Sequence, residues 1–189
     1  MWAPPAMMTA LAAGRVMTEK TGTIGERAML DPAEGDLLVE IDGPRHPGAV
    51  ALYRLWQELR PAGNGVPQRD DLSFERLTEL GIVSNCFVIE PLEGGRDWRY
   101  RLLGTAITWL FGGDATNIPF SKHFMPEEAE LCIRLSNRVA QSRQPVFLFG
   151  RFQPGDFSGT LETMSLPVLA RDGETVWLIG ASFPVETKD

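Results

Sequence analysis

The chain has 189 residues, of which 43% are hydrophobic and 23% are charged, and its formal net charge is −7 at pH 7. This length and composition predict one globular domain with an extension. The acidic balance disfavours a nucleic-acid surface, which needs a basic patch, and the sequence contains no such patch. The two cysteines, Cys86 and Cys132, lie far apart and lack metal-ligand spacing, so neither a disulfide framework nor a zinc site is predicted.

Residues 1–44 mix glycine, proline, threonine and charged residues without sustained periodicity, which predicts a flexible N-terminal extension. The weakly apolar run 6–13 has no basic stretch before it and is too short to span a bilayer. We therefore predict a cytoplasmic protein without an export signal or a membrane anchor. Residues 45–185 form the predicted domain, and residues 186–189 form a short tail.

The first regular element is an amphipathic helix over residues 47–60. Its main apolar stripe consists of Leu52, Leu55, Trp56 and Leu59. Val50 and Tyr53 lie beside this stripe and widen the apolar surface beyond what one contact face requires. We expect the helix to cover one face of a sheet and to contribute Val50, Tyr53 and Trp56 to a homodimer interface. The alternative is a helix that packs only on its own domain.

A short second helix begins after Ser73, a good N-cap residue, and ends at Gly81. Two β-rich segments follow, 82–91 and 97–103, and they are joined by a glycine-containing turn that predicts a hairpin. The periodicity then changes from strand to helix at Gly104-Thr105. Glycine can adopt the backbone of a sharp turn, and a threonine hydroxyl can cap a helix, so we place a strand-to-helix corner here.

The rest of the chain predicts helices and then a three-stranded meander. A short helix follows the corner, a longer one covers 126–143, and the strands lie near 146–152, 161–169 and 175–184. Asp172-Gly173 predicts a tight hairpin between the last two strands. The expected fold is α+β, with a five-stranded antiparallel sheet. Helices inserted between its second and third strands cover one face, and the leading helices cover the other.

This order of elements resembles a PAS sensory domain. Four segments are similar to a bacterial family of stand-alone PAS proteins with a helical N-terminal prefix: LYRLW at 52–56, PQRD at 67–70, YRLLGT at 100–105 and LPVLARDG at 166–173. The resemblance covers about residues 46–185. It implies that the short helices after the corner wall off a pocket against the sheet, and that the helical prefix takes part in dimer formation.

Catalysis finds little support in the residues themselves. His46 and His123 are the only histidines, and no nucleophile-elbow or dinucleotide-binding glycine motif follows a strand. The acidic pair Glu127-Glu128 lies at a helix start, where the helix dipole favours acids. We therefore expect a protein without enzymatic activity.

Apolar side chains of the predicted pocket region are the candidates for ligand binding. They are Trp109, Phe111, Phe120, Phe124, Phe147, Phe149, Met164 and Trp177. Such residues can enclose an organic ligand, and they can equally form a solid core. No cofactor is required by the sequence. The flavin-type Asn-Cys-Arg-Phe run is absent from the helix after the corner, and Asn85-Cys86-Phe87 falls on a strand instead.

The leading functional hypothesis is a non-enzymatic sensory or regulatory module that acts through protein–protein contacts, with a small apolar ligand in the pocket as a further expectation. Because the sequence ends at Asp189 without an output segment, the partner is expected in trans. The alternative is a haem or small-metabolite sensor that uses His123, since some PAS domains hold haem through a histidine in this region. A loop histidine flanked by Phe120 and Phe124 is the simpler interpretation of the same residue.

Overall fold

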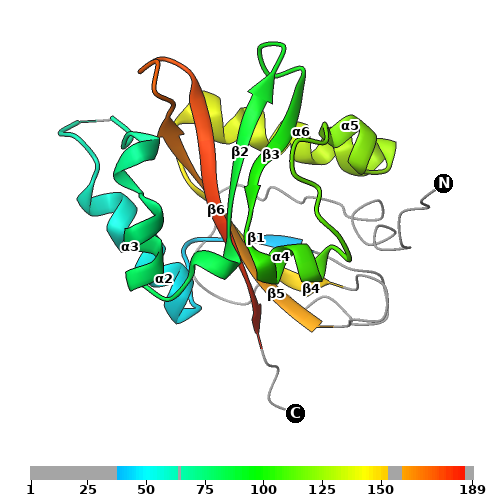
Figure 1. Cartoon of the computed structure of the whole chain (residues 1–189), viewed down its shortest axis with the longest axis horizontal. Helices are drawn as coiled ribbons and strands as arrows, with labels where there is room; N and C mark the ends of the chain where they lie inside the picture. The colour runs from blue at the N-terminus through cyan, green and yellow to red at the C-terminus, as the bar shows by residue number, and fades with distance from the viewer. Residues whose placement is uncertain (1–37, 64, 153–158, 186–189) are drawn as a thin grey trace, which may run out of the picture.

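The computed structural model describes residues 38–63, 65–152 and 159–185, with the backbone alone at residues 151 and 152 (Figure 1). Residues 1–37 of the predicted extension and the predicted tail 186–189 lie outside the described residues. The strands are β1 (Leu38–Ile41), β2 (Cys86–Leu92), β3 (Asp97–Leu103), β4 (Val146–Phe152), β5 (Gly159–Leu169) and β6 (Val176–Val185). The helices are α2 (Pro47–Glu58), α3 (Phe74–Glu79), α4 (Thr105–Leu110), α5 (Phe120–His123) and α6 (Pro126–Ser142), with short 3₁₀ turns η1 (Arg69–Asp71) and η2 (Val83–Asn85).

The sheet has the order β1-β4-β5-β6-β2-β3, and every pairing is antiparallel. The α+β class, the five predicted strands β2–β6 and the insertion of α4–α6 between β3 and β4 are therefore confirmed. The sixth strand, β1, is a difference from the prediction, since residues 38–41 lie within the predicted flexible extension. Four residues are too few for a clear alternation, and it is the pairing with β4, Val39 opposite Phe149, that makes this segment a strand.

Side chains alternate along the strands and create two separate cores. On one face, α4, α5 and α6 pack over a cluster centred on Trp98, Tyr100 and Phe120. On the other face, α2 and α3 pack over a cluster that contains Trp56 and Phe147. Figure 1 shows the sheet between these two groups of helices. The prediction that inserted and leading helices cover opposite faces is confirmed.

Helix α2 is fixed to β5 at both ends by buried polar contacts. The Glu162 carboxylate, 2% exposed, accepts hydrogen bonds from the backbone N–H groups of Arg45 at 2.8 Å and His46 at 3.0 Å. His46 caps the helix, because its Nδ1 accepts a hydrogen bond from the Gly48 N–H at 3.1 Å. Towards the other end, the Trp56 indole N–H donates to the Pro167 carbonyl at 2.8 Å. The His46 bond satisfies the Gly48 amide in the first turn of α2, and the bonds of Glu162 and Trp56 fix the position of the helix over the sheet.

The strand-to-helix corner lies where it was predicted, but its physical basis is different. Gly104 has φ −67° and ψ 153°, an ordinary extended conformation, and it is itself the N-cap residue of α4, while Thr105 is the first helical residue. A Cβ atom on Gly104 would lie 2.2 Å from the backbone oxygen of Ser84. Glycine is needed because η2 approaches the chain closely, and the expectation of a threonine cap was wrong.

The β5–β6 connection is longer than the predicted tight hairpin, since β5 ends at Leu169 and β6 begins at Val176. Gly173 has φ +74°, whereas Asp172 is not among the residues with positive φ. The Asp172 carboxylate instead accepts hydrogen bonds from the N–H groups of Glu174 and Thr175 and from the Thr175 hydroxyl. Asp172 therefore organises the loop, and Gly173 supplies its left-handed residue.

We expect Gly173→Val to lower the free energy of unfolding by about 1 kcal/mol or more, because a β-branched residue at positive φ is strained. Nothing lies within 4 Å of the position that its Cβ would occupy, so a steric clash adds nothing to this effect. Urea unfolding of the variant measures the change. Gly173→Asn is the matched control and should cost less, since asparagine tolerates this conformation. Equal unfolding midpoints for wild type and Gly173→Val would contradict the strain argument.

Candidate ligand pocket and interface

An aromatic cluster fills the space between the sheet and α4–α6. The Tyr100 ring lies at its centre, with centroids 6.0 Å from Phe87, 5.7 Å from Phe111 and 5.1 Å from Phe120. The ring of Phe120 in turn meets Phe124 edge-on at 5.1 Å. Tyr100 points to this face because β3 alternates, with Trp98 and Tyr100 on the same side. Tyr100 is not among the predicted pocket residues, although the alternation in 97–103 places it on the same face as Trp98.

The eight predicted pocket residues do not line one pocket. Phe111, Phe120 and Phe124 belong to the α4–α6 face. The opposite face, against α2, holds the four predicted residues Phe147, Phe149, Met164 and Trp177.

Strand alternation explains this division. Val146 and Leu148 of β4 point to the α4–α6 face, so Phe147 and Phe149 must point away from it. The exposed fraction of Trp109 is 69%, since α4 packs on the sheet through Ile107 instead. The prediction that all eight residues form a single pocket is therefore wrong. Only Phe111, Phe120 and Phe124 lie together on the α4–α6 face.

His123 adds a polar group at the edge of this cluster. Its ring lies 4.7 Å from Phe124 and 6.0 Å from Phe111. Burial lowers the pKa of His123, so the imidazole is neutral at pH 7. Its Nε2 is shielded from solvent and makes no hydrogen bond within the described ranges. A buried nitrogen of this kind is available to a water molecule, a ligand or a metal.

Two further titratable groups on this face, Tyr100 and Cys132, are unsuited to acid–base or nucleophilic work at neutral pH. Burial raises the pKa of the Tyr100 hydroxyl far above its usual range. Burial also raises the pKa of the Cys132 thiol to about 12, with a smaller contribution from the Glu128 carboxylate. Both groups are therefore neutral and act as packing or hydrogen-bonding groups.

Across residues 38–63, 65–152 and 159–185, no group of three or more His, Cys, Asp or Glu side chains is placed to hold a metal ion. The helices in the same ranges include none that is long and apolar enough to cross a membrane.

The predicted interface residues on α2 are mostly engaged within the domain. Trp56 has no exposed surface, so the prediction that it contributes to a dimer interface is wrong. The half-buried Tyr53 ring stacks on Trp56 at 5.9 Å and meets Phe147 edge-on at 5.0 Å. Val50 is also half-buried. Leu52 and Trp56 of the apolar stripe are buried against the sheet. Of the three predicted interface residues, Val50 and Tyr53 keep surface that a partner could contact.

Comparisons with known proteins identify the family. A family model described as "PAS domain" matches residues 44–182. Among solved structures, the chain is similar to the PAS domain of BvgS from Bordetella pertussis, with 21% sequence identity and a TM-score of 0.48, over 64% of this chain and 90% of that one. No curated protein matches the sequence. Because the family model spans most of the described fold, the chain belongs to the PAS domain family.

Proposed function

We propose that this PAS domain is a non-enzymatic regulatory module that acts through protein–protein contacts and responds to a small apolar ligand between the sheet and α4–α6. PAS domains are sensory and regulatory modules, and the observation that supports a ligand here is the aromatic cluster around Tyr100 with the buried His123 Nε2 at its edge. Small-molecule sites combine apolar walls with a few oriented polar groups. A planar apolar molecule with one hydrogen-bonding group would match the aromatic cluster and the His123 Nε2.

The segment that covers the cluster is built from short elements. Helix α5 has four residues, and its Ser121 hydroxyl donates to Asp97 at 2.6 Å. Isolated bridges join Arg99 to Pro119 and Tyr100 to Thr116. These few bonds connect α4–α5 to the edge strand β3, so a ligand that displaces Phe120 or Phe124 would change the position of α5. Such a movement would alter the surface offered to a partner protein.

Native mass spectrometry of the full chain tests the ligand. We expect a small molecule to be released on denaturation from the wild type and from Phe149→Leu, whose altered side chain lies on the opposite face. Phe120→Leu, within the cluster, should carry about tenfold less, since truncation of a ring contact removes about 1.4 kcal/mol of binding energy. No released molecule, or equal loss in both variants, would contradict a ligand at this face.

A haem-binding sensor is the second candidate, and His123 is the observation that favours it. A neutral imidazole with a buried, unbonded Nε2 fits the chemistry of an axial ligand, and Phe111 and Phe124 provide apolar surroundings. Bound haem would supply an iron that binds gases or changes redox state. A Soret band in the purified protein that disappears in His123→Ala would favour this candidate, and a colourless protein would exclude it.

A further inference from the structure

The two edge strands of the sheet, β3 and β1, differ in what lies along their outer sides. Along β3, the Asn117 N–H donates to the Tyr100 carbonyl at 2.8 Å, and an isolated bridge joins Tyr100 to Thr116. β1 pairs with β4 on one side, and no other segment of the described residues pairs with its outer side. An edge of this kind presents backbone N–H and C=O groups with which another strand can pair.

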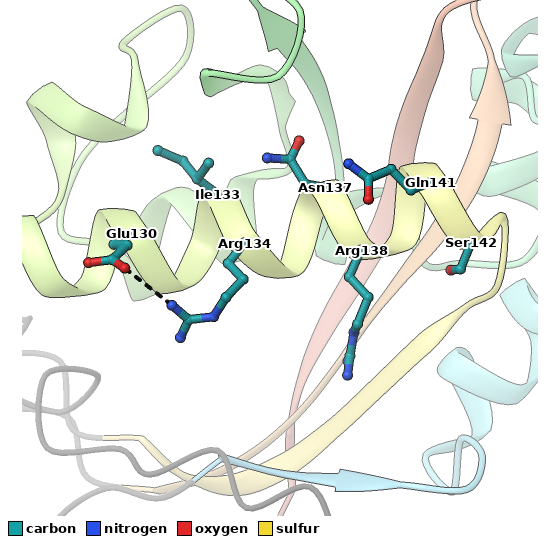
Figure 2. Close-up of a pocket in the computed structure, with 7 residues that line it drawn as sticks. All are labelled: Glu130, Ile133, Arg134, Asn137, Arg138, Gln141 and Ser142. Atoms are coloured by element: carbon teal, nitrogen blue, oxygen red, sulfur yellow. Dashed lines mark hydrogen bonds and ion pairs between the residues drawn. The ribbon is translucent and has the colours of Figure 1, made fainter.

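The side chains of β1 lack the features that usually protect an edge strand, which are lysine, proline and unpaired charges. The strand reads Leu-Val-Glu-Ile, and its one charged group is the Glu40 carboxylate. Arg138 projects from α6 (Figure 2), and its Nη2 donates to Glu40 at 2.9 Å. Val39 points to the opposite face of the sheet, and its exposed fraction is 40%. The edge therefore offers an apolar side chain and a charge that is already neutralised.

An apolar surface on the α2 face reaches this edge. Val39 lies directly opposite Phe149 of β4, whose ring is half-buried and has the Arg45 guanidinium 5.5 Å above its centroid. Two residues earlier on β4, the Phe147 ring meets the half-buried Tyr53 of α2 edge-on at 5.0 Å. The apolar surface of this face therefore continues outwards to Val39 and ends there with its side chain partly exposed.

We propose that β1 pairs antiparallel with β1 of a second copy of the chain, across a two-fold axis that is normal to the sheet and passes through the Val39 pair. An axis of this kind continues each face of the sheet into the same face of the other copy, so residues paired across it point to the same side. Two such registers pair three residues of the four-residue strand, with either Val39 or Glu40 opposite itself. Like charges directly opposite each other are destabilising, so the axis lies at Val39.

The charges along this seam suit a second copy of the chain. Each chain has a net charge of −7, so two copies repel one another and need a contact without unpaired charge. In the proposed register Glu40 lies opposite Leu38 of the partner subunit and keeps its ion pair with Arg138. On the other face, Phe149 and Val39 of both copies form one apolar row across the seam. This interface lies apart from the aromatic cluster and does not depend on a ligand there.

Sedimentation velocity of the full chain over a range of concentrations tests the proposal. We expect the wild type to form a dimer and Val39→Lys to raise its Kd about tenfold or more, because two ammonium groups then lie opposite each other on the axis. Leu80→Lys is the matched control, since it places the same charge at a 38% exposed apolar position at the end of α3. It should leave the Kd unchanged.

A charge exchange tests the register itself. Val39→Glu alone should also weaken the dimer, whereas an equimolar mixture of Val39→Lys and Val39→Glu should restore it, because each ammonium group then lies opposite a carboxylate. Restoration requires that both variants fold, so it separates loss of the interface from loss of the fold.

A cross-link tests the same seam without a change of charge. Mild oxidation should join Val39→Cys into a covalent dimer, because the two introduced thiols lie opposite each other, and should leave Leu80→Cys monomeric on a non-reducing gel. A wild type that stays monomeric at all concentrations would overturn the proposal, as would Val39→Cys that does not cross-link. A dimer that persists in Val39→Lys and dissociates in Val50→Glu would also overturn it, since the interface would then lie on α2.

Discussion

Gly104→Ala is expected to destabilise the domain by about 3 kcal/mol or more, although alanine accepts the backbone conformation of this residue. The added Cβ would lie 2.2 Å from the Ser84 oxygen, 2.5 Å from the Ser84 carbonyl carbon and 2.7 Å from the Val83 oxygen. All three are backbone atoms, which cannot rotate away as a side chain can. Relief of the clash requires η2 to move away from β3. Urea unfolding followed by circular dichroism measures the cost.

Gly43→Ala is the control for this experiment, since no atom lies within 4 Å of the Cβ it would add. We expect its free energy of unfolding to stay within about 0.5 kcal/mol of wild type. Gly104→Val should be at least as destabilising as Gly104→Ala, because its larger side chain meets the same backbone. A Gly104→Ala protein with wild-type stability would mean that η2 and the corner are farther apart than the structure places them.

The strand-to-helix corner at Gly104-Thr105 shows which structural features the local sequence predicts and which it does not. The change from strand periodicity to helix periodicity placed the bend at Gly104-Thr105 correctly. The reason for glycine lies twenty residues earlier in the chain, where the Ser84 carbonyl approaches it. A contact of this kind leaves no periodic pattern near either residue. The strands β2–β6 and the helices α2 and α6 were predictable because each is long enough to show its period.

The prediction that eight residues line one pocket was wrong for a different reason, because the pattern that separates them is present in the sequence. Alternation along β4 places Val146 and Leu148 on one face of the sheet and Phe147 and Phe149 on the other. The predicted pocket combined residues by their aromatic character and did not take this alternation into account. Glu162 had no such signal, because an acidic residue in a strand usually faces water. Only the fold shows that its carboxylate accepts hydrogen bonds from the N–H groups of Arg45 and His46, immediately before α2. The contact of Glu162 with the residues that lead into α2 could therefore not be predicted from the sequence.

Trp56→Ala is expected to lower the free energy of unfolding by about 3 to 5 kcal/mol, the usual cost of removing a large buried aromatic side chain. The indole has no exposed surface and belongs to the core beneath α2. Its removal also leaves the Pro167 carbonyl without the N–H donor that now lies 2.8 Å away. Thermal and urea unfolding measure the loss. A change below about 1 kcal/mol would mean that α2 is not held on this face of the sheet.

Trp56→Phe separates packing from the hydrogen bond. It keeps an aromatic ring and loses the bond to Pro167, so a smaller cost of about 1 to 2 kcal/mol is expected.

The same variant, Trp56→Phe, tests the role of α2 in assembly. Because Trp56 is wholly buried within one domain, Trp56→Phe should leave the sedimentation behaviour of the folded protein unchanged. Val50 keeps some exposed surface, so a homodimer that forms through α2 should instead dissociate in Val50→Glu. A dimer that responds to Trp56→Phe and ignores Val50→Glu would show that α2 packs against a second copy of the chain through the face assigned here to its own sheet.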